Sequence, residues 1–573
     1  MEVIRRALRF QVLCALGVLL ATPAWTQTSA VSAVNTASFA LPQLANGSLA
    51  QGGMFAVFGT NLGPASLVKV SSFPLPTELS GTSVSVTVGG TTLDCIMVFS
   101  FSSQLAAVLP SNTPTGDGTL TATYNGQSSS PISITVVAHS FGTFAVNTAG
   151  SGPGVLTNAN NPLSVNTIFN AAMSGQMWDI WGTGLGAVQG DEAAMPLPGP
   201  LPYDVQVLVG GVAAQVVYVG RSGCCVGLDQ IRFVVPTDTI GCYVPLTVVV
   251  EGVVSNFTTM AISESAGGCT DESKGIDPMV LSDAHARGNL RVGAIFGSRV
   301  RTTFSLPTGF PSQGSDFTQT GEIFAAFFEE FSVREAEAST IDPQGCYVYQ
   351  FSADDGRELP DPIEARLLDA GSTMMLNPGS EVIPVEPDFS FFKFFNLPTL
   401  GFLKAAALRR GRGSKDQSPF PTGPPFYQDN TTYTADWPGG ADVGSGSGTF
   451  ETGTPMVWTN PTDTISRGSP FEVRWQGGVG DKVLIGGVSF LALDGEDEGV
   501  GAAFLCNVDR APGSFVLPGQ ITGALPPSVT IEGIPTGSFS VASQMYTSCN
   551  ASSLDICFSG FSDADFRSGI GYR

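Results

Sequence analysis

Histidine and positive charge are scarce in this sequence. Two histidines occur among 573 residues, and 26 lysines and arginines are set against 49 aspartates and glutamates, which gives a net charge of −23. A polyanion of this kind repels the phosphates of nucleic acids, so we expect no nucleic acid partner. Neither His139 nor His285 lies in an H-E-x-x-H motif or beside a recognisable nucleophile motif.

Motifs for catalysis and cofactor binding are also lacking. No glycine-rich segment ends in the Lys-Ser/Thr pair that a phosphate-binding loop requires. Any two of the 49 acidic residues could meet in space as the carboxylate pair of a glycosidase, but nothing local singles out a pair. We therefore predict a non-enzymatic protein with no catalytic residue and no bound cofactor.

Long apolar runs are confined to the N-terminus. Three arginines precede an apolar stretch from Val12 to Ala21, and small residues follow it. This order predicts a secretory signal peptide over residues 1–27. Because no later segment reaches the length of a transmembrane helix, we expect a mature chain without a transmembrane anchor, secreted from a bacterial cell or held at its surface.

One sequence pattern occurs twice. The stretch Phe58–Gly63, which reads F-G-T-N-L-G, returns as Trp181–Gly186, W-G-T-G-L-G, roughly 120 residues later. Each copy follows an apolar strand and precedes a Pro-Leu-Pro and then a double glycine, Gly89-Gly90 or Gly210-Gly211. Glycine and asparagine tolerate positive φ, so both copies suit a sharp turn at a strand end. An internal repeat of this length predicts one structural module used twice.

Alternation of apolar and polar residues marks strands throughout the chain. Val84, Val86 and Val88 alternate with small polar residues, and Asn125-Gly126 is typical of a tight hairpin turn. Many short strands bounded by glycine, proline or asparagine predict an all-β fold built from antiparallel sandwiches.

The repeated turn resembles a known signature. F-G-T-N-L-G after an apolar strand is similar to the turn of IPT/TIG immunoglobulin-like domains. Together with P-L-P, V-x-V-G-G and the stretch Gln230–Pro236, it resembles a family of large secreted acidobacterial proteins with immunoglobulin-like repeats, over residues 31 to 270. A V-W-T-N strand, a W-x-G-G turn and an F-x-C strand further on resemble the C-terminal domain of that family. The resemblance implies tandem immunoglobulin-like sandwiches, and the family has no established activity to carry over.

These patterns divide the chain into five parts. They are a signal peptide (1–27), two immunoglobulin-like sandwiches (28–138 and 139–268), a β-rich domain of uncertain fold (269–425) and a C-terminal sandwich-like domain (426–573). The phenylalanines between Phe324 and Phe331 fit either a helix or a buried strand. The stretch from Gly413 to Gly448 is rich in glycine, proline, serine and threonine and predicts a linker or long loop. The short connection between the repeats favours a semi-rigid rod.

Cysteine usage fits an exported protein. Ten cysteines occur, one of them inside the predicted signal peptide, so disulfides are expected rather than metal thiolates. Local clustering predicts that Cys224 and Cys225 bond within the second repeat, with Cys242 and Cys269 as their partners. It also predicts a small loop closed by Cys549 and Cys557. The double cysteine also suits zinc, but no C-x-x-C partner or nearby histidine supports that alternative.

Two acidic clusters near the C-terminus are candidates for calcium. Asp494, Glu496 and Asp497 form one, and Asp563 and Asp565 form the other. Carboxylate oxygens on a turn can hold calcium, although the first cluster lacks the ordered spacing of an EF-hand loop. A calcium site and a solvated acidic loop are both open interpretations.

The sequence as a whole predicts an exported β-sandwich array that acts in adhesion, as a scaffold or in binding. Sandwiches present loops at their ends, where recognition residues can vary without disturbing the core. We expect the loops Gly186–Met195 and Gly220–Gly227, or the aromatic stretch Phe389–Phe402, to contact an extracellular polysaccharide or a surface protein. The alternative is a polysaccharide-active or polysaccharide-binding protein with its site in residues 270–573.

Overall fold

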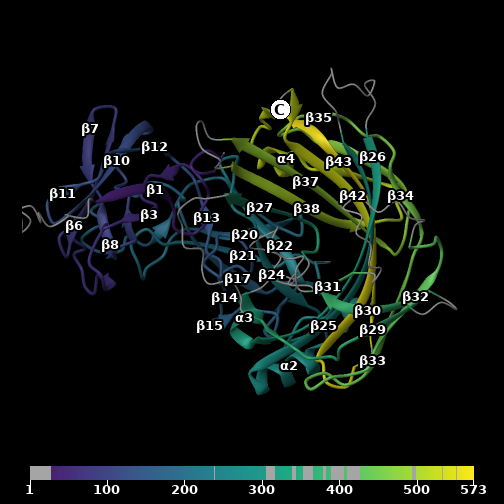
Figure 1. Cartoon of the computed structure of the whole chain (residues 1–573). Helices are drawn as coiled ribbons and strands as arrows, with labels where there is room; N and C mark the ends of the chain where they lie inside the picture. The colour runs from purple at the N-terminus through teal and green to yellow at the C-terminus, as the bar shows by residue number, and fades with distance from the viewer. Residues whose placement is uncertain are drawn as a thin grey trace, which may run out of the picture.

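The fold is all-β, as predicted, and is built from sheets packed face to face (Figure 1). The computed structural model describes residues 28–573 except 45, 238, 305–316, 339–342, 353–364, 379–382, 389–405, 410–425, 493–498, 532 and 550. The predicted signal peptide and the aromatic stretch Phe389–Phe402 therefore lie outside the described residues.

Module one, residues 28–138, packs two sheets around one core. Their orders are β1-β3-β9-β8-β4 and β2-β12-β10-β6-β5. The strands are β1 (Ser29–Asn35), β2 (Leu49–Ala50), β3 (Met54–Thr60), β4 (Val68–Lys69), β5 (Glu78–Leu79), β6 (Thr82–Val88), β7 (Thr91–Asp94), β8 (Ile96–Ser100), β9 (Gln104–Val108), β10 (Gly116–Tyr124), β11 (Gln127–Ser128) and β12 (Ile132–Val137). The alternating valines of β6 point inward and are almost completely buried, as their spacing predicts.

Module two, residues 139–268, repeats this plan. Its sheet order is β15-β14-β17-β21-β20-β19-β22-β24-β16, and β20 pairs with β21 along one part and with β19 along another. The strands are β13 (Gly142–Thr143), β14 (Leu156–Asn158), β15 (Asn161–Val165), β16 (Ala172–Met173), β17 (Met177–Thr183), β18 (Gly199–Pro200), β19 (Val205–Val209), β20 (Val212–Arg221), β21 (Asp229–Val234), β22 (Gly241–Val250), β23 (Val253–Val254) and β24 (Thr258–Ser263).

The repeated turn serves the same purpose in both modules. Asn61 (φ +53°) and Gly184 (φ +102°) occupy equivalent positions and reverse the chain after β3 and β17. The next residue is Leu62 in one module and Leu185 in the other, and each is 0% exposed in its module's core. The repeat therefore encodes a strand-end turn that places a leucine in the core.

Residues 269–573 form one interleaved domain. Its main sheet runs β27-β38-β37-β42-β43-β25-β26-β31-β30-β29-β32-β33. The strands of this sheet and its neighbours are β25 (Asn289–Phe304), β26 (Phe317–Ser332), β27 (Cys346–Ser352), β28 (Arg366–Leu367), β29 (Met374–Pro378), β30 (Ile383–Asp388), β31 (Ala406–Arg409), β32 (Thr432–Trp437), β33 (Gly446–Glu451), β34 (Thr454–Trp458), β35 (Thr464–Ile465), β36 (Phe471–Gly478), β37 (Lys482–Ala492), β38 (Gly499–Asp509), β39 (Ser514–Leu517), β40 (Thr530–Ile531), β41 (Ile534–Pro535), β42 (Gly537–Ser548) and β43 (Ile556–Tyr572).

The predicted boundary between residues 425 and 426 is therefore wrong. β25 lies between β26 and β43, and it pairs in parallel with β43, which is more than 250 residues later in the chain (register Val292↔Ile556 to Thr303↔Arg567). The sheet also curls back on itself, because Phe450 of β33 stacks on Phe561 of β43 with ring centroids 5.8 Å apart. Local patterns do not reveal a pairing over this distance.

Two further interpretations of this region are resolved by the structure. The phenylalanines between Phe324 and Phe331 lie on β26, so the strand interpretation is right and the helical one is wrong. The predicted linker from Gly413 to Gly448 contains β32 and the start of β33, which pair with each other. Its glycines and threonines belong in part to an edge hairpin of the main sheet.

Helices are few and short in the described residues. They are η1 (Glu272–Lys274), α2 (Pro278–Arg287), α3 (Val333–Ala338) and α4 (Gly519–Gly523). Asp277 caps α2 by accepting hydrogen bonds from the N–H groups of Met279 (2.8 Å) and Val280 (3.0 Å), and proline follows at the first helical position. Within the described ranges, no helix has the length and apolar character needed to span a bilayer.

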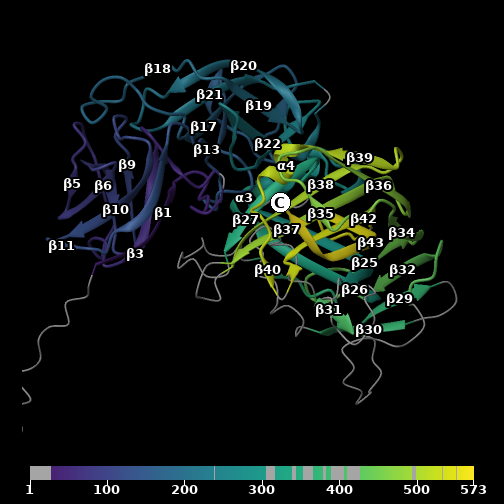
Figure 2. The same cartoon turned by 90° about the horizontal axis from the view of Figure 1, so that it is seen from above.

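The three parts lie in an arc when viewed from above (Figure 2). Module one, in purple, and the C-terminal domain, in green and yellow, lie on either side of module two. One apolar cluster contains Ile168 and Tyr243 of module two together with Leu281 and Phe331 of the C-terminal domain. The core is therefore continuous across that boundary.

Candidate functional site

Buried polar groups join module one to module two. Arg221, at the end of β20, and Asp229, at the start of β21, form an ion pair whose side chains are 3% and 0% exposed. Arg221 also donates from Nη2 to the carbonyl oxygens of Gly52 in module one (2.7 Å) and Gly186 in module two (2.8 Å). Burial raises the pKa of Asp229 to about 6, and the adjacent Arg221 opposes that rise. One guanidinium therefore binds both modules at once.

Further hydrogen bonds cross the same joint. Asn35 of module one donates from Nδ2 to the carbonyls of Ser140 (2.9 Å) and Thr183 (3.1 Å). The hydroxyl of Thr183 accepts from the N–H of Met54 (2.8 Å) and donates to the carbonyl of Gly227 (2.6 Å). These bonds satisfy polar groups that the joint would otherwise bury without partners, so they favour one relative orientation.

The two module-two loops expected to meet a partner pack into this joint. Glu192, in the loop Gly186–Met195, is 7% exposed and accepts from the N–H of Ser111 in module one (2.8 Å). Val226, in the loop Gly220–Gly227, is buried against Ile96 and Val108 of module one. Both loops therefore stabilise the contact between modules.

A second joint connects module two to the C-terminal domain. The hydroxyl of Tyr347 on β27 accepts from the N–H of Gly152 at 2.6 Å, and its ring contacts Phe257 with centroids 6.3 Å apart. Burial raises the pKa of Tyr347 to about 12. The N–H of Gln344 donates to the carbonyl of Tyr243 at 3.0 Å. Module two is therefore held on both sides.

Four disulfides form among the described cysteines. They are Cys224–Cys225, Cys242–Cys269, Cys346–Cys506 and Cys549–Cys557, and Cys95 is buried and free. The loop closed by Cys549 and Cys557 is as predicted. The expected pairing of Cys224 and Cys225 with Cys242 and Cys269 is wrong. The first two bond to each other in the loop after β20, and the other two bond to each other in an apolar cluster with Leu281 of α2.

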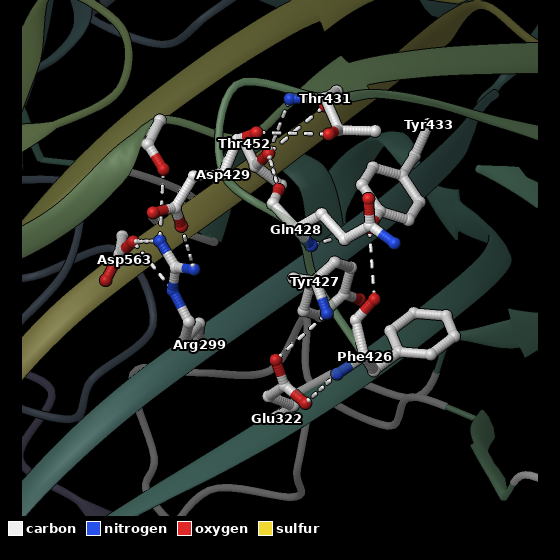
Figure 3. Close-up of polar contacts among 11 residues, drawn as sticks. Arg299, Glu322, Phe426, Tyr427, Gln428, Asp429, Thr431, Tyr433, Thr452 and Asp563 are labelled. Atoms are coloured by element: carbon white, nitrogen blue, oxygen red, sulfur yellow. Dashed lines mark hydrogen bonds and ion pairs between the residues drawn. The ribbon is translucent and has the colours of Figure 1, made fainter. Parts of the chain in front are cut away.

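A buried charge network lies within the C-terminal domain (Figure 3). Arg299 on β25 faces Asp563 on β43 in the parallel register, and its Nε and Nη2 donate to Asp563 Oδ2. Its Nη1 donates to Asp429 Oδ1 at 2.7 Å, and Nη2 also donates to the carbonyl of Gly453 at 3.1 Å. Burial raises the pKa of Asp563, and Arg299 opposes this by hydrogen bonding and charge.

The second predicted calcium cluster is engaged by arginines. Asp565 lies two residues after Asp563 on the same face of β43. It accepts from Arg301 Nη2 at 2.7 Å and from the N–H of Trp458 at 3.0 Å. Asp563 and Asp565 are each 2% exposed, and each carboxylate forms an ion pair with a guanidinium group. The other candidates, Asp494, Glu496 and Asp497, lie outside the described residues. The residues that are described contain no group of three metal-ligating side chains.

A second polar group fixes the segment 426–431 above the sheet (Figure 3). The carboxylate of Glu322 on β26 accepts from the N–H groups of Phe426 (2.6 Å) and Tyr427 (3.0 Å). Tyr433 donates from its hydroxyl to the carbonyl of Phe426 at 3.0 Å and accepts from the N–H of Gln428 at 2.9 Å. Burial raises the pKa of Tyr427 well above its usual range.

These two groups have the chemistry of structural supports. Asp563 and Asp429 both bind Arg299, and Glu322 accepts two backbone hydrogen bonds. A general acid or base must be able to reach the proton that it transfers. The side chain of Asp563 is 3% exposed, and its charge is paired with that of Arg299. This geometry suits a residue that holds β43 to β25.

Both histidines take part in packing contacts. His139 donates from Nδ1 to the carbonyl of Leu185 at 2.6 Å, and its ring meets Tyr203 edge-on with centroids 4.4 Å apart. His285 is exposed on α2, and its ring contacts the ring of Phe169 with centroids 5.3 Å apart. His139 therefore packs against other residues of module two.

The sequence interpretation missed Arg221, Asp229 and Arg299. A signal for the last of these exists, because Arg299 and Arg301 are two positions apart on one strand, as Asp563 and Asp565 are on another. Complementary charges at matching i, i+2 spacing indicate facing strands. Asp229 immediately precedes the repeated Gln230-Ile231, where module one has an uncharged serine.

Comparisons with known proteins give the fold alone. No family model and no curated protein matches the chain. Similar solved structures include a Gamma-CGTase from alkalophilic Bacillus clarkii (9% identity, TM-score 0.15, covering 49% of this chain and 34% of that one). The Bacteroides ovatus glucan-utilisation protein SGBP-B in complex with a mixed-linkage heptasaccharide also matches (15% identity, TM-score 0.19, covering 48% of this chain and 63% of that one). Immunoglobulin domains 1–5 of Sidekick-1 match as well (10% identity, TM-score 0.13, covering 90% of this chain and 99% of that one).

The chain spans about a third of the first of these structures and under two thirds of the second. At these identities and TM-scores, the likeness extends to a β-sandwich, immunoglobulin-like architecture and carries no argument about activity.

Proposed function

We propose that this protein is an exported, non-enzymatic binding and scaffold protein that holds its modules as one rigid body at the cell surface or outside the cell. The observation that carries the proposal is the pair of buried joints on either side of module two. Arg221 bonds to Gly52 across one joint, and Tyr347 bonds to Gly152 across the other. A protein that spaces or presents a ligand gains from such stiffness, because less conformational freedom is lost on binding.

Export is supported by chemistry on the described chain. Disulfides such as Cys242–Cys269 and Cys346–Cys506 persist in oxidising compartments and are rare in the cytosol. The predicted signal peptide over residues 1–27 agrees with this location. Membership of the secreted acidobacterial family with immunoglobulin-like repeats is part of the same proposal and rests on the repeated turn, Phe58–Gly63 and Trp181–Gly186.

The choice of binding over catalysis rests on how the charged groups of residues 270–573 are used. The polysaccharide-active form of the alternative requires a carboxylate pair in an accessible cleft. Three acids lie near Tyr427 in Figure 3, and each is bound by an arginine or by backbone N–H groups: Glu322, Asp429 and Asp563. This arrangement supports a structural role for the three acids.

The proposal is tested with the full chain produced in an exporting host. N-terminal sequencing of the protein recovered outside the cytoplasm should show that the first residues are missing. The same material is then incubated with polysaccharides, esters and peptides and with extracts of cell-surface protein. Binding without turnover is expected. Recovery with Met1 intact would contradict export, and reproducible turnover lost on changing one carboxylate in residues 270–573 would establish the enzymatic alternative.

A further inference from the structure

The outer face of module two carries a row of side chains across three neighbouring strands. β17, β21 and β20 lie side by side in that sheet (Figure 2). Trp181 on β17 is paired with Gln230 on β21, and Gln230 is paired with Gly220 on β20. The adjacent residues Ile180 and Ile231 are 0% exposed in the core. Because side chains alternate along a strand, Trp181 and Gln230 point outward.

Tyr218 completes the row from a β-bulge. The register of β20 shifts between Val216 and Tyr218, which turns the tyrosine to the outer face opposite Arg232. Its hydroxyl donates to the carbonyl of Arg221 at 3.0 Å, so the ring runs along β20 toward the row. A Cβ at Gly220 would lie 2.1 Å from the carbonyl oxygen of Gly199 and 2.6 Å from that hydroxyl. Glycine at this position therefore leaves room for both the neighbouring backbone and the tyrosine side chain.

The indole of Trp181 is also held in place. Its Nε1 donates to the hydroxyl of Thr157 on β14 at 2.8 Å, and the residue is half-buried. The other tryptophans of the described chain, Trp178, Trp437, Trp458 and Trp475, are between 1% and 6% exposed. Trp181 and Gly220 are two strands apart, so their Cα atoms lie about 10 Å from each other. The indole and the tyrosine ring therefore lie at opposite ends of the row, with β21 between them.

Hydrogen-bonding groups lie between and beside the rings. The side-chain amide of Gln230 is half-exposed and makes no hydrogen bond to any residue that the structure describes. Arg232, two residues further along β21, is bound to Asp179 through Nε and Nη2, each at 2.8 Å. That salt bridge orients the guanidinium and leaves Nη1 free to donate, and the side chain is 33% exposed.

We propose that this strip, formed by Trp181, Gln230, Tyr218 and Arg232, binds one extended chain of an uncharged polysaccharide built from pyranose sugars. Aromatic faces stack on the C–H faces of pyranose rings, and a few fixed polar groups beside them select hydroxyl positions. The net charge of −23 disfavours polyanionic polymers. The inference rests on the proposed binding function and names its ligand class and its site.

The experiment measures binding of four hexasaccharides to the full chain by calorimetry and tryptophan fluorescence. The probes are cellohexaose, xylohexaose, mannohexaose and, as the anionic comparison, hexagalacturonate. At least one neutral probe should bind and change the emission of the half-exposed Trp181, and hexagalacturonate should not bind. Trp181→Ala should weaken binding about tenfold or more. Trp181→Phe should keep measurable binding and abolish the emission change.

Two further variants separate loss of the site from loss of the fold. Gln230→Ala removes a side chain without an internal partner and should weaken binding while the melting temperature stays unchanged. Phe490→Ala, at an aromatic residue 37% exposed on β37, is the matched control and should bind as well as the unchanged chain.

The outcomes distinguish the strip from the proposed function. The proposal that the strip binds a polysaccharide is wrong if no neutral hexasaccharide binds the folded chain. It is also wrong if binding persists in both Trp181→Ala and Gln230→Ala. If the chain then still binds a surface protein or another polymer, the proposed binding function remains supported although the strip is not its site. Cleavage of a bound hexasaccharide would instead overturn the proposed function.

Discussion

Replacing Arg299 with methionine tests whether the buried charge network supports the C-terminal domain. Methionine keeps an unbranched apolar side chain of similar reach and removes the guanidinium. Asp563, whose side chain is 3% exposed, then loses the cation that neutralises it. Removing one partner of a buried ion pair costs about 3–5 kcal/mol, because the other charge is left in a low-dielectric site. We expect a loss of that size in the free energy of unfolding at pH 7.

The loss should also depend on pH. Burial already raises the pKa of Asp563 above its ordinary 3.8, and removing Arg299 takes away the main opposing influence. A carboxyl group with a higher pKa in the folded state than in the unfolded state binds its proton preferentially when folded. Its contribution to stability is therefore present at low pH and is lost as the pH rises through the folded pKa. The defect of Arg299→Met should shrink between pH 7 and pH 4.

Urea unfolding, monitored by proteolysis of the C-terminal domain, measures both the loss of stability and its dependence on pH. The double variant Arg299→Met/Asp563→Leu should recover much of the loss, because it leaves no buried charge unpaired. Lys482→Met is the matched control, since its salt bridge to Asp509 is exposed and should contribute no more than about 1 kcal/mol. A single Arg299→Met variant within about 1 kcal/mol of the unchanged chain at pH 7, or a defect that does not vary with pH, would refute the reasoning.

Two further changes test the disulfides and the second joint. Replacing both Cys242 and Cys269 with serine should lower the free energy of unfolding by about 2–4 kcal/mol. The melting temperature, measured without reductant, should fall accordingly. Equal melting temperatures for the variant and the unchanged chain would argue against the bond. Tyr347→Phe leaves the buried N–H of Gly152 without its acceptor and should lower the free energy of unfolding by about 1–3 kcal/mol. Amide hydrogen exchange at Gly152 should become faster. Unchanged exchange would show that water replaces the hydroxyl.

Local patterns predicted much of the fold because the residues that form the turns also define the modules. The positive φ of Asn61 and Gly184 follows directly from the repeated sequence. The alternating valines of β6 likewise identify their buried face. Inferences of this kind need only neighbours in sequence.

Long-range pairing explains what could not be predicted. The parallel pairing of β25 with β43 joins residues 264 positions apart, such as Arg299 and Asp563, and it erases the boundary expected at residue 425. The disulfide between Cys346 and Cys506 spans 160 positions and was not expected either. Such contacts depend on which strands meet in the folded chain, and local periodicity carries no information on that choice.

The candidate site was harder to predict than the fold. The joint depends on Arg221, whose guanidinium bonds to three residues drawn from both modules. In the sequence, a charged residue at a strand end looks like a surface residue. The acidic pair Asp563 and Asp565 was noticed for its clustering, but its partners on β25 were not. A recurring charge spacing on two strands is informative only when both strands are considered together.

The central claim is that the modules form one rigid body, and a distance distribution across the whole molecule tests it most directly. Spin labels introduced as unnatural amino acids at Thr92 in module one and Asp509 in the C-terminal domain would both lie on exposed positions. Pulsed electron spin resonance should give one narrow distance distribution for the unchanged chain. Arg221→Met, which removes the bond to Gly52, should broaden it. A broad distribution in the unchanged chain would contradict the account.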